Sequence, residues 1–209
     1  IPGSIILLIT FIFLQLRNPS PLLDLKLFSN RIFSYSSLTR FLGFTSRSGG
    51  MLLLPVFLLN IRGLDEFTIV LLMFSGALGM GIGAQSGGRL SDIFGRRRFV
   101  IFGFVLAVLN SMLMAWYQQE TPLLLIVLTL FVNGISMGLW STPNQVITVN
   151  ATPKSKFGPV GALINLTRNT GNVTGQAIAT AVIAAVLGFQ GFDIELSQVG
   201  IMKGSVVAF

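Results

Sequence analysis

The sequence predicts an all-α membrane protein, a polytopic bundle of helices that cross a lipid bilayer. Apolar residues make up 52% of the 209 residues, charged residues only 10%, and the mean hydropathy is +0.80. A soluble domain of this size would carry roughly a quarter charged residues on its surface. The apolar residues gather in long runs, and helices of about 20 such residues cross a hydrocarbon core of about 30 Å. Lipid is therefore the expected solvent for much of this chain.

Each apolar run is expected to be a helix, because lipid offers the backbone no other way to satisfy its hydrogen bonds. The runs cover residues 5–16, 33–61, 67–85, 99–117, 123–142 and 160–189, and another starts at residue 205. The first and the last are interpreted as truncated, so that the chain is a fragment with about six spans. We expect the end of a preceding helix (1–16), a cytoplasmic linker (17–32), and a helical domain (33–209) with five full spans and the start of a sixth.

The loops alternate strictly between basic and neutral-to-acidic. The basic positions are Arg17, Lys26, Arg31, Arg89, Arg96, Arg97, Arg98, Lys154 and Lys156. By the positive-inside rule, the loops near 17–32, 89–98 and 152–157 are predicted to be cytoplasmic in a multi-pass protein of the cell (inner) membrane. The net charge of +7 could also suggest nucleic acid, but charges confined to short loops favour membrane orientation, so no nucleic-acid partner is expected.

The residue types exclude several kinds of chemistry. Cysteine and histidine are both absent, which removes disulfides, thiol nucleophiles, Cys/His metal sites and histidine proton relays. All seven acidic residues fall in or beside predicted loops, so paired carboxylates inside the spans are lacking. We therefore expect no enzyme, no cofactor and no metal site. If the protein is proton-coupled, its coupling carboxylate is expected in a missing N-terminal half.

A motif of glycines and charges lies between the second and third full spans, at residues 88–98. We expect a tight loop in which Gly88 lets helices approach closely, Asp92 caps a helix N-terminus and Gly95 permits a sharp turn. The arginines can pair with Asp92 or with lipid phosphate. On this physical basis alone, an ordinary positive-inside loop with a capping acid remains an alternative.

The motif resembles the G-x-L-x-D-x-x-G-R-R signature of the major facilitator superfamily. Six residues match it: Gly88, Leu90, Asp92, Gly95, Arg96 and Arg97. The resemblance implies the C-terminal half of a major facilitator-type fold. It also implies alternating access, with a charge relay of Asp92, Arg96 and Arg97 that stabilises one access state.

Other segments resemble the branch of fourteen-helix drug:proton antiporters. They are the extra helix before residue 17, the segment 21–28, the Leu54–Pro55 pair and the segment 165–175. This resemblance implies a transporter that exports amphipathic or cationic small molecules in exchange for protons, that is, multidrug efflux. The implied partners are the lipid bilayer, the missing N-terminal half, a small-molecule substrate and protons.

Polar residues inside the spans are candidates for the substrate path. Arg47 lies near the middle of its span, although a shorter span that begins after Gly50, or a snorkelling side chain, would also account for it. A polar stripe recurs at helical spacing on a later span: Asn165, Arg168, Asn169, Asn172 and Gln176. Glycine pairs four residues apart, such as Gly79 with Gly83, are more often packing devices than site residues.

Two questions stay open at this point. The polar residues around Pro143 (Thr142, Asn144 and Gln145) are compatible with a helix end or with a gate. The alternatives to a drug exporter are a transporter of another substrate class, such as an anion or a sugar, and a non-transporting sensor or scaffold built on the same bundle. Intramembrane arginines would suit an anionic substrate.

Overall fold

The computed structural model describes residues 25–153 and 157–189, and all described elements are helices. A short 3-10 helix, η1 (Leu25–Ser29), precedes five α-helices. These are α2 (Arg31–Asn60), α3 (Glu66–Phe94), α4 (Arg96–Met114), α5 (Leu123–Asn150) and α6 (Phe157–Phe189). Four of them, α2 to α5, are long and apolar enough to cross a membrane. The predicted all-α membrane fold is confirmed; α6 carries the polar stripe and is not among the four, so its crossing stays a prediction.

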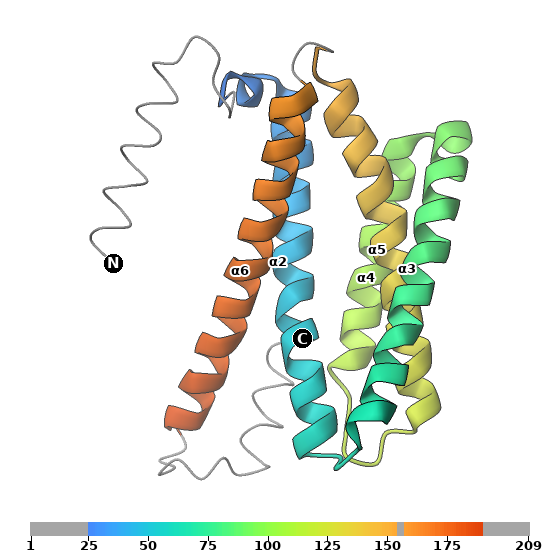
Figure 1. Cartoon of the computed structure of the whole chain (residues 1–209), viewed down its shortest axis with the longest axis vertical. Helices are drawn as coiled ribbons and strands as arrows, with labels where there is room; N and C mark the ends of the chain where they lie inside the picture. The colour runs from blue at the N-terminus through green and yellow to red at the C-terminus, as the bar shows by residue number, and fades with distance from the viewer. Residues whose placement is uncertain (1–24, 154–156, 190–209) are drawn as a thin grey trace.

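The five helices run lengthwise beside one another in two groups (Figure 1). Helix α6 packs along α2, while α3 and α4 both pack on α5. The start of α2, the α3–α4 junction, the end of α5 and the start of α6 all lie at one end of the bundle. Among the described residues, the basic starts of α2 and α4 therefore lie at the same end of the bundle.

Local signals explain where the helices begin and end. The side chain of Asn30 accepts a hydrogen bond from the Ile32 backbone N–H at 2.9 Å, which caps α2. The carboxylate of Asp65 accepts the Thr68 backbone N–H at 3.0 Å and caps α3 in the same way. Helix α3 ends at Gly95, whose φ of 97° lies in a region that favours glycine.

The helices are longer than the apolar runs at their basic ends. Helix α3 continues from residue 85 to Phe94, and α5 continues through Pro143 to Asn150. The polar residues around Pro143 therefore do not mark a helix end. Helix α2 is continuous over Arg31–Asn60, so Arg47 lies in mid-helix and not before a shorter span that starts after Gly50.

Glycines bring α3 and α5 into close backbone contact. A Cβ atom on Gly79, Gly83, Gly134 or Gly138 would overlap the backbone of the facing helix. Gly171 and Gly175 do the same for α6 against α2, where a Cβ would meet the backbone of Phe41 or Thr45. The expectation that these glycine pairs serve packing is confirmed, since without a hydrophobic drive in lipid, helix association relies on such close approach.

A cluster of buried apolar side chains joins α2, α3, α4 and α5 at the end opposite the basic motif. Its members are Leu54, Phe57, Leu58, Ile61, Ile69, Leu72, Met114, Tyr117, Ile126 and Leu130. Large apolar side chains such as Phe67, Ile93 and Phe102 are exposed on the outside of the bundle. Such a surface is stable in lipid and not in water.

Candidate functional site

The signature motif lies across a helix–helix junction and not in a loop. Gly88, Leu90 and Asp92 belong to about the last two turns of α3, Gly95 is the single connecting residue, and Arg96 begins α4 with Arg97 next to it. The predicted loop was wrong because the helical backbone continues past the apolar run into the polar boundary of the membrane. Asp92 and Arg96 are therefore four residues apart on either side of the junction.

One ion pair links the two helices of the motif. Arg96 donates from Nη2 to the Asp92 Oδ1 atom at 2.6 Å and from Nε to the same atom at 3.1 Å. The predicted capping role of Asp92 was wrong, because α4 has no side-chain cap. Both side chains are exposed, at 36% for Arg96 and 60% for Asp92, so the pair contributes at most about 1 kcal/mol.

The close helix approach beside the motif occurs at Gly87 and not at Gly88. A Cβ on Gly87 would lie 3.0 Å from the Leu139 Cα atom, whereas a Cβ on Gly88 would make an ordinary contact of 3.7 Å with Thr142. Leu90 is exposed, while the adjacent Ser91 is buried and bonds back to the carbonyl of Gly88 at 3.0 Å. The end of α3 thus rests on α5 through Gly87 and Ser91.

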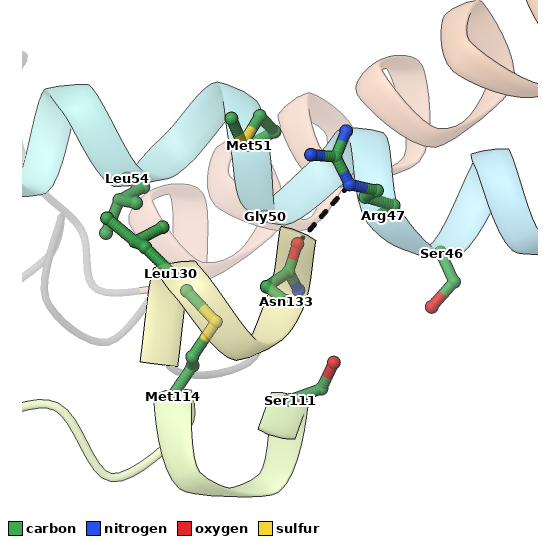
Figure 2. A pocket seen from close by; sticks show the side chains of 9 residues that line it. All are labelled: Ser46, Arg47, Gly50, Met51, Leu54, Ser111, Met114, Leu130 and Asn133. Atoms are coloured by element: carbon green, nitrogen blue, oxygen red, sulfur yellow. Dashed lines mark hydrogen bonds between the residues drawn. The ribbon is translucent and has the colours of Figure 1, made fainter. Parts of the chain in front are cut away.

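Arg47 lines a small polar pocket between α2, α4 and α5 (Figure 2). Its Nε donates to the Asn133 Oδ1 atom of α5 at 3.3 Å. The cavity of about 30 Å³ is otherwise lined by Ser46, Gly50, Met51, Leu54, Ser111, Met114 and Leu130. A neighbouring cavity of about 420 Å³ shares Arg47 and Asn133 and extends along α4. Arg47 is therefore half-buried beside polar groups, as a cation inside a membrane span requires.

The polar stripe of α6 lies beside the α2 contact and not within it. Asn165, Arg168, Asn169 and Gln176 are exposed on the described chain. Asn172 is half-buried, and its backbone carbonyl accepts a hydrogen bond from the Ser48 hydroxyl at 2.9 Å. Among the described residues, no side-chain hydrogen bond joins Arg47 to this stripe, so the structure does not unite the predicted substrate-path residues in a single cluster.

A further arginine within a predicted span, Arg40, was missed by the sequence-based prediction. It is only 2% exposed and lies nine residues into α2, about 13 Å along the helix axis. One turn earlier in α2, Ser36 bonds to α5: the Asn144 amide donates to the Ser36 carbonyl at 3.2 Å, and Thr148 donates to the Ser36 hydroxyl at 3.0 Å. The seven-residue spacing to Arg47, which places both arginines on one helix face, could have revealed it.

In residues 25–153 and 157–189, no three acidic, histidine or cysteine side chains lie close enough to hold a metal ion. The polar groups of the site are arginines, amides and hydroxyls. Groups of these types are suited to hold a ligand by charge and hydrogen bonds, and among the described residues none of them is a nucleophile paired with a neighbouring base.

Comparison with known proteins decides the family. The profile of the Major Facilitator Superfamily matches residues 5–192, nearly the whole chain. The chain belongs to this superfamily. The multi-pass helical fold and the likeness to a lincomycin resistance protein and a multidrug resistance protein agree with the sequence-based prediction.

Individual relatives in the superfamily are similar over most of this chain. The lincomycin resistance protein LmrB of Listeria innocua is 29% identical over 175 residues, 84% of this chain. The riboflavin transporter RibZ of Clostridioides difficile is 27% identical over 183 residues, 86% of this chain, and the multidrug resistance protein Stp of Mycobacterium tuberculosis is 25% identical over 177 residues, 85% of it. The chain spans 37%, 40% and 33% of the length of these three relatives.

Proposed function

We propose that the chain is the C-terminal half of a secondary transporter that exports amphipathic or cationic small molecules in exchange for protons. The observation that carries this proposal is the exposed polar stripe of α6, with Arg168 at its centre, on a bundle that exposes many large apolar side chains. In a membrane, such polar groups face a water-filled path or a partner, because lipid does not solvate them. The names of LmrB and Stp, a lincomycin resistance and a multidrug resistance protein, support export of drug-like molecules.

In the proposed mechanism, two halves rock about a central path near the middle of the bilayer. The stripe from Asn165 to Gln176 faces this path, and Arg47 adds a cation held by Asn133. A ligand that passes along the path exchanges hydrogen bonds with amides and guanidinium groups in place of water. Movement of the halves then opens the path to one side of the membrane at a time.

The ion pair between Asp92 and Arg96 is proposed to bias the cytoplasmic gate. It joins α3 to α4 across one residue, Gly95, so a change in the angle between the helices changes the ion pair. An exposed pair contributes at most about 1 kcal/mol, which corresponds to about a fivefold shift between two states. A bias of this size favours one access state without locking the transporter in it. Arg97, the next residue, adds positive charge on the same side of the junction.

The coupling group for protons is proposed to lie in an N-terminal half. All seven acids of this chain fall outside the interior of the described helices or outside the described residues. The basic end of the bundle is proposed to face the cytoplasm of a bacterial cell, with the protein in the inner membrane, by the positive-inside rule.

The proposal is tested by efflux of a lipophilic cation dye from energised vesicles that contain the full-length protein. We expect proton-dependent efflux that is lost when Arg168 is replaced by alanine and kept in the control Arg31→Ala, an exposed arginine at the start of α2. Folded wild-type protein that moves no such dye would contradict drug export. Equal efflux by Arg168→Ala and Arg31→Ala would remove the α6 stripe from the path.

A further inference from the structure

The buried arginine of α2, Arg40, has no counter-charge on the described chain. Its Nε and Nη2 atoms have no hydrogen-bond partner among the described residues, although the residue is only 2% exposed. The nearby charge of Arg168 on α6 repels it and does not neutralise it. The Asn144 amide oxygen is also without a donor, while its nitrogen bonds to Ser36, one turn before Arg40.

An unpaired guanidinium is costly in this position. A charge removed from water without a partner is strongly destabilising, and intramembrane charges are accordingly paired or functional. The described helices provide no partner, because their acids, Asp92 and Glu66, lie at the ends of α3 and not beside Arg40. The neutralising group must therefore come from outside the described helices.

The unpartnered atoms indicate which chemistry fits. The Nε and Nη2 atoms of an arginine lie on one edge of the planar guanidinium and point their N–H groups the same way, which matches the two oxygens of a carboxylate. The same edge of Arg96 holds the carboxylate of Asp92 in this protein. Arg40 presents that edge buried and without a hydrogen-bond partner, one turn after Ser36.

We propose that Arg40, with the second positive charge of Arg168 nearby, forms a binding site for a carboxylate group. The inference rests on the proposed function and refines it: the carboxylate belongs either to the transported molecule or to an acidic side chain of the N-terminal half. In the first case the substrates include amphipathic molecules with a carboxylate end. In the second case the arginine is a contact between the two halves that forms in one access state.

The test uses a rhodamine dye with a free carboxylate and its methyl ester, which share the same ring system and ring charge. Binding of each dye to the purified full-length protein is measured by fluorescence polarisation. If the substrate supplies the carboxylate, the wild type binds the free acid more tightly than the ester. Replacement of Arg40 by glutamine then weakens the free acid about tenfold or more and the ester little, as loss of a charge-assisted bidentate pair predicts.

If the N-terminal half supplies the carboxylate, the two dyes bind alike and Arg40→Gln slows the efflux of both. Neutralising one acid of that half in the same protein then restores efflux, because both members of the pair are gone. Arg31→Gln, at an exposed site on the same helix, is the control. Should Arg40→Gln fail to fold, Arg40→Lys serves in its place. Lysine keeps the charge but cannot make a bidentate contact with a carboxylate, so the same losses of binding or efflux are expected.

Binding and efflux of both dyes at wild-type levels in folded Arg40→Gln and Arg40→Lys would overturn the carboxylate site. The proposed function fails separately. If the wild type moves neither dye across the membrane, drug export is refuted, while binding to the purified protein still decides whether Arg40 holds the carboxylate of the free-acid dye.

Discussion

The close contact between α3 and α5 makes a quantitative prediction for Gly83. A Cβ at this position would lie 2.8 Å from the Cα and 2.9 Å from the carbonyl carbon of Ile135. Carbon atoms in favourable contact are separated by about 3.5–4.0 Å, so the facing backbones must move apart by roughly 1 Å. Because the contact is with backbone, no side-chain rotation relieves the overlap.

The same helix provides a matched control in Gly81. This residue is exposed, and a Cβ there would meet nothing within 4 Å. Replacement of either glycine by alanine brings the same gain in helix propensity, about 0.5–1 kcal/mol. Only Gly83→Ala adds the cost of overpacking, typically about 1–3 kcal/mol. The difference in unfolding free energy between the two variants is therefore about 1–3 kcal/mol, with Gly83→Ala less stable.

The measurement is the unfolding midpoint of the full-length protein in mild detergent, for wild type, Gly81→Ala and Gly83→Ala. We expect Gly81→Ala to equal or exceed the wild type and Gly83→Ala to fall below both. A second matched pair lies on α6, where Gly161 is open and Gly175 faces Thr45 of α2. Equal midpoints for Gly81→Ala and Gly83→Ala would refute the argument that close backbone approach holds α3 on α5.

Three further predictions concern the motif, the pocket and a helix cap. Asp92→Asn should slow transport more than it weakens substrate binding and should change stability by less than about 1 kcal/mol; equal losses of turnover and binding would count against a gating role. Arg47→Gln and Asn133→Leu should form a coupled double-mutant cycle in dye efflux, because the two residues share a hydrogen bond. The second change should have little further effect once the first has been made, and additive losses would mean that the residues act independently. The hydroxyl and the backbone N–H of Thr68 hold the pKa of Asp65 below its ordinary value of 3.8. The ionised carboxylate therefore stabilises the folded protein fully above pH 3.8, and this stabilisation is lost as the pH falls below that value. Asp65→Asn should remove this acid-dependent fall in the unfolding midpoint, and an unchanged pH dependence would contradict the prediction.

The candidate site was only partly predictable from the sequence. Arg47 and the α6 stripe stand out because a charge or an amide within an apolar run has a high transfer cost. Arg40 escaped notice because it lies near the basic start of its span, where a positive charge is usual. Its significance comes from its burial and from its two guanidinium nitrogens without a partner, which only the packed helices reveal.

The sequence alone determined the solvent and most of the secondary structure of this protein, and its orientation stays a prediction. Apolar runs of membrane length require helices, and the alternation of basic loops requires their ends to face opposite sides. Helix ends were less well determined: α3 continues to Phe94, because hydropathy falls at the membrane boundary while backbone hydrogen bonding does not.

The tertiary structure decided which faces meet. Lipid dissolves every apolar face about equally well, so hydropathy does not choose partners, and helix pairing depends on where small residues permit backbone contact. That selection places Gly83 against Ile135, packs Gly175 on Thr45, and encloses Arg40 without a counter-charge from the described helices. Such contacts join residues distant in sequence, so they exist only once the helices have packed.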